Sequence, residues 1–235
     1  MKTIPRAERL IVALDVPSAE AAKSLVQRLG DSTSFYKIGL QLFMADGYFG
    51  LIDWLARQGK KVFVDLKFFD VPEIVGAAVR GLRGRGVTFA TVHGNQPILE
   101  AAGKEKGEVK ILAVTALTSL DQGDLEDLGF QCDIQKLVLS RARRALEAGC
   151  DGVISSGLEA PLLKRELGGR LLVVTPGIRP VQNRPSDDQK RTVDVAQAFA
   201  NGADYIVVGR PIHQASDPRA AALGIQATIA AVFSA

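Results

Sequence analysis

Short apolar runs recur along the chain, and a longer segment with the apolar spacing of a helix follows most of them. Eight runs have the length and the Val and Ile content of strands, at residues 10–14, 34–38, 61–66, 87–92, 109–114, 152–154, 171–175 and 205–208. Several are apolar on both faces, which is typical of parallel strands buried between two layers. The pattern predicts eight strands that alternate with helices.

The segments between these runs also carry helix end signals. Residues 134–148 place their apolar side chains on one side of a helix, and Gly149 follows where a glycine commonly ends one. Ser18 is positioned to cap a helix that begins at Ala19. Eight such units close most simply into one α/β domain, a single (β/α)8 TIM barrel over residues 1–235.

An open, doubly wound sheet is the alternative fold. Its usual sign is a Gly-x-Gly-x-x-Gly turn after the first strand. Here the first strand is followed by Asp15-Val16-Pro17, so that sign is missing and the barrel is favoured.

Composition and charge exclude several classes of partner. The chain is 47% hydrophobic and 23% charged, as expected of a globular protein, and its net charge of +3 includes no Lys/Arg run that would indicate nucleic-acid binding. The apolar runs are far shorter than the roughly 18–20 residues of a membrane span, and the first residues lack the apolar stretch of a signal peptide. We therefore expect a cytoplasmic protein that binds neither nucleic acid nor membrane.

The cysteines and histidines give no sign of a disulfide or of a metal cluster. Cys132 and Cys150 are expected to be reduced in a cytoplasmic protein, although two cysteines could form one disulfide. His93 and His213 are the only histidines and lie far apart in sequence, so no zinc or iron site is expected. His93 is interpreted as structural, with a catalytic role as the alternative.

Charged side chains gather at the predicted carboxyl ends of the first three strands. They are Asp15, Lys37, Asp65 and Lys67, followed in the next loop by Asp70. Asp65 and Lys67 are two residues apart and so point to the same side of their strand, and in (β/α)8 barrels the chemistry lies at this end. One interpretation is a structural network of ion pairs. The other is a general acid, in which carboxylates keep a lysine protonated and aim it at one carbon without metal or cofactor.

Three of these segments resemble one enzyme family. Asp65-Leu66-Lys67-Phe68-Phe69-Asp70-Val71-Pro72 resembles the Asp-x-Lys-x-x-Asp signature of the orotidine 5'-monophosphate decarboxylase family. Ala13-Leu14-Asp15 and Tyr36-Lys37-Ile38-Gly39 are similar to that family at matching strand ends. The resemblance runs from the first strand to Gly209-Arg210-Pro211-Ile212, although sugar-phosphate enzymes of the same superfamily share the signature.

Two positions depart from the family pattern. Phe69 stands where many bacterial members have His, and Glu73-Ile74 stands where many have Asn-Thr. The threonine hydroxyl of the family helps to hold the substrate sugar. Ile74 has no such donor, so weaker sugar binding is expected, by about 0.5–1.5 kcal/mol for one neutral hydrogen bond.

The loops after the seventh and eighth strands pair a glycine with an arginine. They contain Gly177 with Arg179, and Gly209 with Arg210. Barrels often bind phosphate here, because glycine lets backbone N–H groups approach an anion and arginine forks onto its oxygens. Loop glycines beside surface arginines are the alternative. The resemblance implies that both arginines are ligand positions, with Arg210 on the phosphate, and that Gln189 in the long loop 180–190 also contacts the phosphate.

The loop after the fifth strand, Thr115-Ala116-Leu117-Thr118-Ser119, resembles the pyrimidine loop of the family. The resemblance implies that Thr118, with Ser119 beside it, hydrogen-bonds the base of the substrate. A helix cap or a turn is the alternative role for either hydroxyl taken alone.

The resemblance implies a complete function. The chain would remove CO2 from C6 of orotidine 5'-monophosphate and release UMP, in de novo pyrimidine biosynthesis, with no cofactor and no metal. Lys67 would stabilise and protonate the carbanion at C6, flanked by Asp65 and by Asp70 of a second subunit, while Lys37 and Asp15 reach the ribose hydroxyls. A homodimer with shared active sites follows. Two alternatives remain, a Mg2+-dependent sugar-phosphate decarboxylase or aldolase and a non-catalytic phosphate-binding barrel.

Overall fold

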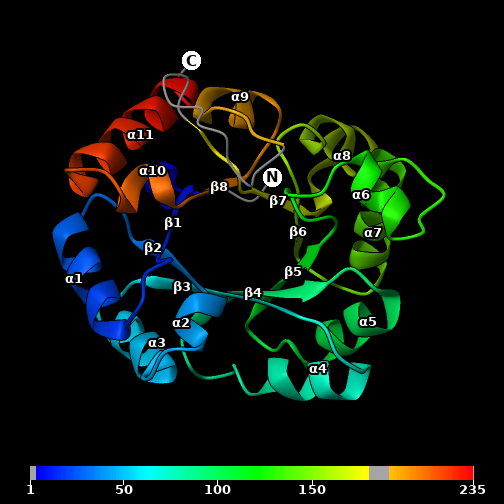
Figure 1. Cartoon of the computed structure of the whole chain (residues 1–235), viewed down its shortest axis with the longest axis horizontal. Helices are drawn as coiled ribbons and strands as arrows, with labels where there is room; N and C mark the ends of the chain where they lie inside the picture. The colour runs from blue at the N-terminus through cyan, green and yellow to red at the C-terminus, as the bar shows by residue number, and fades with distance from the viewer. Residues whose placement is uncertain (1–3, 180–190, 235) are drawn as a thin grey trace.

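The computed structural model describes residues 4–179 and 191–234, which form a closed parallel barrel surrounded by helices (Figure 1). The strands are β1 (Leu10–Ala13), β2 (Phe35–Gly39), β3 (Lys61–Phe68), β4 (Val87–His93), β5 (Lys110–Val114), β6 (Gly152–Ile154), β7 (Leu172–Thr175) and β8 (Tyr205–Val208). Each strand pairs with the next one in the chain, and β8 returns to pair with β1. The predicted (β/α)8 barrel is confirmed, and the doubly wound sheet is excluded.

The helices lie outside the strands and cover the barrel on all sides (Figure 1). The longer ones are α1 (Ala19–Leu29), α3 (Tyr48–Arg57), α4 (Pro72–Arg80), α5 (Gln96–Glu105), α7 (Ile134–Glu147), α8 (Ala160–Leu167) and α11 (Pro218–Val232). The shorter ones are α2 (Leu40–Phe43), α6 (Gln122–Asp127), α9 (Val195–Ala200), α10 (Arg210–His213) and the 3-10 helices η1 (Arg6–Glu8) and η2 (Gly168–Arg170). None of the described helices is both long enough and apolar enough to cross a membrane.

All eight predicted strands are present, and their boundaries agree within one residue except in β3. That strand was expected to end at residue 66 but continues to Phe68, so that Lys67 belongs to it. The helix end signals are also confirmed. The Ser18 side chain accepts a hydrogen bond from the Ala21 amide at the start of α1, and Gly149 adopts a positive φ of 76° just after α7.

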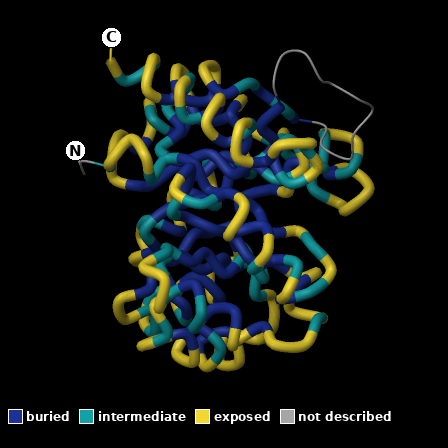
Figure 2. The backbone as a smooth tube through the Cα atoms, turned by 90° about the vertical axis from the view of Figure 1, so that its left-hand side faces the viewer, coloured by how far each residue is buried: buried dark blue, intermediate teal, exposed yellow. Residues whose placement is uncertain are grey.

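The core has two layers, because alternate residues of each strand face opposite sides of the sheet. Outward-facing residues pack against the helices. Inward-facing ones fill the barrel with an aromatic cluster, Phe35, Phe63, Phe89 and Tyr205, whose ring centroids lie 5.1 to 6.0 Å apart. Figure 2 shows the result, with buried backbone at the centre and exposed backbone on the outer helices and loops.

The two cysteines are not joined, as predicted for reduced thiols. Cys150 is buried between α7 and β6, and burial raises the pKa of its thiol to about 12. Cys132 lies in the loop before α7 and is partly exposed.

Candidate active site

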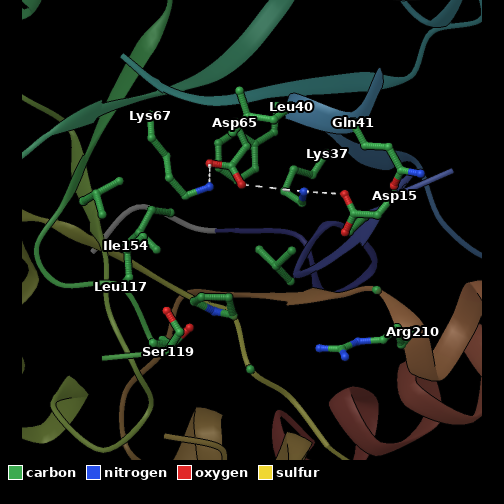
Figure 3. A pocket seen from close by; sticks show the side chains of 18 of the residues that line it. Asp15, Lys37, Leu40, Gln41, Asp65, Lys67, Leu117, Ser119, Ile154 and Arg210 are labelled. Atoms are coloured by element: carbon green, nitrogen blue, oxygen red, sulfur yellow. Dashed lines mark hydrogen bonds and ion pairs between the residues drawn. The ribbon is translucent and has the colours of Figure 1, made fainter. Parts of the chain in front are cut away.

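Four charged side chains form a row across the mouth of the barrel at the ends of β1, β2 and β3 (Figure 3). Lys67 Nζ lies 3.0 Å from Asp65 Oδ1. The other oxygen of Asp65 lies 3.6 Å from Lys37 Nζ, which is also 2.9 Å from Asp15 Oδ1. Positive and negative charges therefore alternate along what we call the charged row, made of Asp15, Lys37, Asp65 and Lys67.

The alternation of strand residues places the row above the aromatic floor. On β2 the inward positions run from Phe35 to Lys37, and on β3 they run from Phe63 to Asp65 and then Lys67. Each strand therefore changes from apolar to charged on the same face as it nears its carboxyl end. The expectation that Asp65 and Lys67 share one side is confirmed by the contact between them.

The centre of the row is more buried than its ends. Lys37 and Asp65 have 11% and 12% of their side-chain surface exposed, against 32% for Lys67 and 44% for Asp15. Burial by itself would raise the pKa of Asp65, but the charges of Lys37 and Lys67 and two hydrogen bonds hold that pKa below its usual value. Burial would likewise lower the pKa of Lys37, but Asp65 and Asp15 raise it. Asp65 is therefore a carboxylate and Lys37 an ammonium at neutral pH.

Lys67 stands at an irregular point of β3. Its φ of 49° is positive, which is true of no other non-glycine residue in the described ranges 4–179 and 191–234. Val64 and Phe68 pair with Ala90 and Val92, so β3 contains two more residues than β4 over this stretch. The buried Thr91 of β4 bridges the irregularity, a contact that the sequence pattern did not indicate. Backbone irregularity of this kind is concentrated at functional sites.

A cavity of about 770 Å³ opens in front of the charged row. Eight of the ten residues predicted for the site line it: Asp15, Lys37, Asp65, Lys67, Thr118, Arg179, Gly209 and Arg210. They come from the ends of β1, β2, β3, β5, β7 and β8, which are distant in sequence and meet only in the closed barrel. A cavity of this volume is typical of a small-molecule site.

Arg210 lies across the cavity from the charged row (Figure 3). It is the first residue of α10, directly after Gly209. Gly177, in the loop after β7, also lines the cavity and has a φ of 74°, a conformation that favours glycine. Arg179 has 9% of its surface exposed, and its Nη1 donates a 2.9 Å hydrogen bond to the carbonyl of Ile178. The arginines that line the cavity are thus separate from the charged row.

The loop after β5 is held from behind by a buried ion pair that sequence reasoning missed. Arg191 Nη1 lies 2.6 Å from Glu159 Oε1, and the two side chains are 9% and 4% exposed. Arg191 Nη2 also donates to the carbonyl of Leu117 at 2.9 Å, and the Arg191 amide donates to the carbonyl of Thr118 at 3.3 Å. The pair therefore fixes the backbone around Thr118, which lines the cavity.

The structure does not bring Asp70 to the cavity of its own chain. Its side chain is exposed and accepts a 2.6 Å hydrogen bond from the Val71 amide. Ile74, on α4, is 53% exposed. Phe69 is 65% exposed and stacks on His93 with ring centroids 4.3 Å apart. Gln189 lies outside the described residues.

His93 does not line the cavity, and its contacts agree with a structural role. Its Nδ1 lies 2.8 Å from Asn95 Oδ1, and burial lowers the pKa of its imidazole. Within residues 4–179 and 191–234, no three or more His, Cys, Asp or Glu side chains come together in a group that could hold a metal ion.

The chain is similar over nearly its whole length to proteins of one family. The model of the orotidine 5'-phosphate decarboxylase / HUMPS family matches residues 8–225. An orotidine 5'-phosphate decarboxylase from Methylococcus capsulatus is 68% identical over 234 residues, which cover 100% of this chain and 97% of that protein. Another, from Stenotrophomonas maltophilia, is 50% identical over 97% of this chain and 95% of its own length.

A solved structure has the same barrel. The crystal structure of orotidine 5'-phosphate decarboxylase from Lactobacillus acidophilus aligns with a TM-score of 0.83 and 35% identity. The alignment covers 94% of this chain and 99% of that one.

Proposed function

The chain belongs to the orotidine 5'-phosphate decarboxylase / HUMPS family and decarboxylates orotidine 5'-monophosphate to UMP and CO2; on that premise, we propose a role in this reaction for each residue of the site. The observation that carries the proposal is the charged row. It presents the Lys67 ammonium to a cavity that is also lined by two arginines, Arg179 after β7 and Arg210 after β8. A ligand with an acidic group at each end fits such a cavity.

Lys67 is the general acid of this proposal. When the bond between C6 and the carboxylate breaks, CO2 leaves and the electron pair stays on C6. The nearby ammonium stabilises that negative charge and then transfers one proton to C6, which leaves UMP and a neutral amine that solvent reprotonates. Asp65 supports this role through its 3.0 Å contact, which keeps the ammonium in place.

The other members of the row bind and orient. Asp65 flanks the substrate carboxylate, and Lys37 and Asp15 hydrogen-bond the ribose hydroxyls. The Lys37 contacts to Asp15 at 2.9 Å and to Asp65 at 3.6 Å connect ribose binding to the reacting end. Groups fixed in this way need little rearrangement when the substrate arrives.

The phosphate binds at the opposite side of the cavity, on Arg210 and the backbone of Gly209, with Arg179 as a further ligand. Gln189 completes this set in the proposal. Thr118, held by the Arg191 contacts behind it, hydrogen-bonds the base. Binding energy from the phosphate, which does not react, supports the transition state at C6.

The proposal includes a homodimer with shared active sites. Asp70 is exposed and outside its own cavity, and the large apolar side chains of Phe69, Val71 and Ile74 around it are 53% to 65% exposed. Exposed apolar side chains in such numbers on one segment are typical of an interface. In a two-fold dimer, Asp70 then enters the partner's cavity. A cytoplasmic location belongs to the same proposal, because the substrate and the product are charged nucleotides.

A decarboxylation assay tests the reaction itself. The purified protein should consume orotidine 5'-monophosphate, followed by its ultraviolet absorbance, and release UMP and CO2 in equal amounts. An active enzyme that acts on a sugar phosphate and leaves orotidine 5'-monophosphate unchanged would contradict the assignment.

Mixed dimers test the shared site. Lys67→Ala and Asp70→Asn should each be nearly inactive alone. When they exchange subunits, half of the dimers are mixed, and each mixed dimer has one site with both changes and one with neither. About a quarter of all sites are then intact, by the symmetry of the dimer. Recovery of about that fraction of wild-type activity is expected. No recovery despite demonstrated exchange would place Asp70 in its own chain's site.

A further inference from the structure

A single buried hydroxyl joins the two residues at the reacting end of the charged row. Thr91, on β4, has no exposed surface and lies at an inward position above Phe89. The Lys67 amide donates to Thr91 Oγ1 at 2.9 Å, and Thr91 Oγ1 lies 2.9 Å from Asp65 Oδ1. The same carboxylate oxygen lies 3.0 Å from Lys67 Nζ. These contacts form a closed ring from the backbone of Lys67 to its own ammonium.

The direction of each hydrogen bond in this ring is determined by chemistry. The Lys67 amide can only donate, so the Thr91 oxygen accepts from it. The hydroxyl proton is then directed to Asp65, which is charged and can only accept. The Thr91 hydroxyl therefore accepts one hydrogen bond and donates another, and a methyl group in its place could do neither.

The backbone of Lys67 needs this support. The two extra residues of β3 interrupt the ladder to β4 between Val64 and Phe68, which is where Lys67 lies. Its positive φ of 49° is a conformation that a lysine rarely adopts. The Thr91 hydroxyl takes the place of a ladder carbonyl for the Lys67 amide, so it stabilises both the turn of the backbone and the direction in which the side chain leaves it.

We propose that Thr91 is a positioning residue for the decarboxylation. It does not line the cavity. It fixes the Lys67 backbone and the Asp65 carboxylate relative to each other, so that the ammonium stands where the C6 carbanion forms. The inference rests on the proposed role of Lys67 as general acid. Its consequence is that Thr91 affects turnover more than it affects nucleotide binding.

The test removes the hydroxyl and keeps the shape. In Thr91→Val, kcat for orotidine 5'-monophosphate is expected to fall about 10- to 100-fold, because small displacements of a reacting group have effects of that size. The dissociation constant for UMP should change by less than about threefold, since the phosphate and base contacts are elsewhere. Thr91→Ser retains the hydroxyl and should keep kcat within about threefold of wild type.

Thr33→Val is the matched control. Thr33 is also buried, and its hydroxyl likewise accepts from a backbone amide, that of Phe35, and donates to an oxygen, that of Leu10. It precedes β2 at the amino-terminal end of the barrel, away from the cavity. Both valine variants should lose thermal stability, but only Thr91→Val should lose turnover.

The kcat values of the Thr91 variants decide whether Thr91 has the positioning role. Full kcat in a folded Thr91→Val, or an equal loss in Thr91→Ser, would overturn the positioning role. If Thr91→Val does not fold, Thr91→Ala takes its place, and Thr91→Ser must still retain kcat. Failure here is distinguishable from failure of the proposed function: in that case Lys67→Ala would itself remain active, or the wild type would not decarboxylate orotidine 5'-monophosphate.

Discussion

Two sets of buried charges lie at the same end of the barrel and are built differently. In the pair Arg191–Glu159, both side chains are at least nine-tenths buried, and Arg191 also donates to the carbonyl of Leu117. Neither residue lines the cavity. The charged row of Asp15, Lys37, Asp65 and Lys67 does line it, and its terminal lysine is one-third exposed.

The difference lies in where each network ends. The charges of Arg191 and Glu159 face each other and backbone carbonyls of the loop after β5, and neither faces the cavity, although Arg191 Nε and Glu159 Oε2 are buried without a hydrogen-bond partner among the described residues. The row has a buried centre, Lys37 and Asp65, but its last cation faces the space where a ligand binds. A buried ion pair whose charges face only protein groups supports structure. A network whose last charge faces a ligand cavity can also take part in chemistry.

The largest effect is expected from Lys67→Ala. Loss of general-acid and electrostatic stabilisation should lower kcat on the order of 10⁴-fold or more, while UMP still binds. Steady-state assays and calorimetric binding of UMP measure the two quantities. Lys61→Ala is the control, because Lys61 lies on the inward face of the same strand at its other end, paired with Glu8. Near-normal turnover in Lys67→Ala would remove this residue from the mechanism.

Glu159→Gln should have its main effect on stability. It leaves the Arg191 charge buried without its partner, which costs about 3–5 kcal/mol in comparable pairs. For a chain of this size the midpoint of thermal unfolding should then fall by roughly 6–20 °C. The kcat of the folded protein should change by less than about threefold, since Arg191 keeps its contacts to the carbonyls of Leu117 and Thr118 and neither partner lines the cavity. A large loss of kcat at unchanged stability would abolish the contrast between the two networks.

A double change tests how strongly Glu159 and Arg191 stabilise each other. Replacing both partners, in Glu159→Leu with Arg191→Met, removes the uncompensated charge and should be less destabilising than Glu159→Gln. Recovery should be incomplete, because Arg191 also serves the carbonyls of Ala116 and Leu117. Urea unfolding of the single and double variants gives the coupling energy between the partners. Strictly additive losses would show that the pair has no mutual stabilisation.

Arg210→Ala should weaken binding of phosphorylated ligands about ten- to a hundredfold, the equivalent of roughly 1.5–3 kcal/mol for a charged hydrogen bond. Binding of uridine, which has no phosphate, should hardly change. The comparison of UMP with uridine by calorimetry separates a phosphate contact from general damage to the cavity. Equal losses for both ligands would show that Arg210 does not touch the phosphate.

Chelation should have no effect on activity. Lys67 and Lys37 already occupy positions beside the two oxygens of Asp65, at 3.0 and 3.6 Å, where a divalent cation would otherwise coordinate. Activity with and without EDTA is the measurement. Stripped enzyme that regains turnover only with Mg2+ would favour the sugar-phosphate chemistry of the same superfamily.

The barrel could be predicted from sequence because its signals are local. Each strand is a short apolar run, and residue alternation was enough to place Asp65 beside Lys67. Eight predicted site residues line one cavity for the same reason, since each follows or ends a recognisable strand. Resemblance to a known family was needed to assign roles to Thr118 and Arg179, whose residue types alone allow several.

The supporting contacts could not be predicted, because they join positions with no sequence relation. Thr91 is one threonine within an apolar strand, and its bond to the Lys67 amide exists only because β3 carries two extra residues. Glu159 and Arg191 are 32 residues apart, and the sequence around each gives no sign that the two form a buried pair. The positive φ of Lys67 likewise contradicts the regular strand that its neighbours indicate.

The pairing of β8 with β1 has a consequence for how the protein reaches its active form. Leu10 pairs with Ile206, so the barrel closes only when residues from opposite ends of the chain meet, which is slow compared with local contacts. A partly folded chain with β1 to β3 formed already carries Asp15, Lys37, Asp65 and Lys67, but Arg210 joins them only with the last strand. Regain of decarboxylation during refolding therefore requires the barrel to have closed and, with shared active sites, the subunits to have paired, so its rate sets a lower limit on the rate of closure.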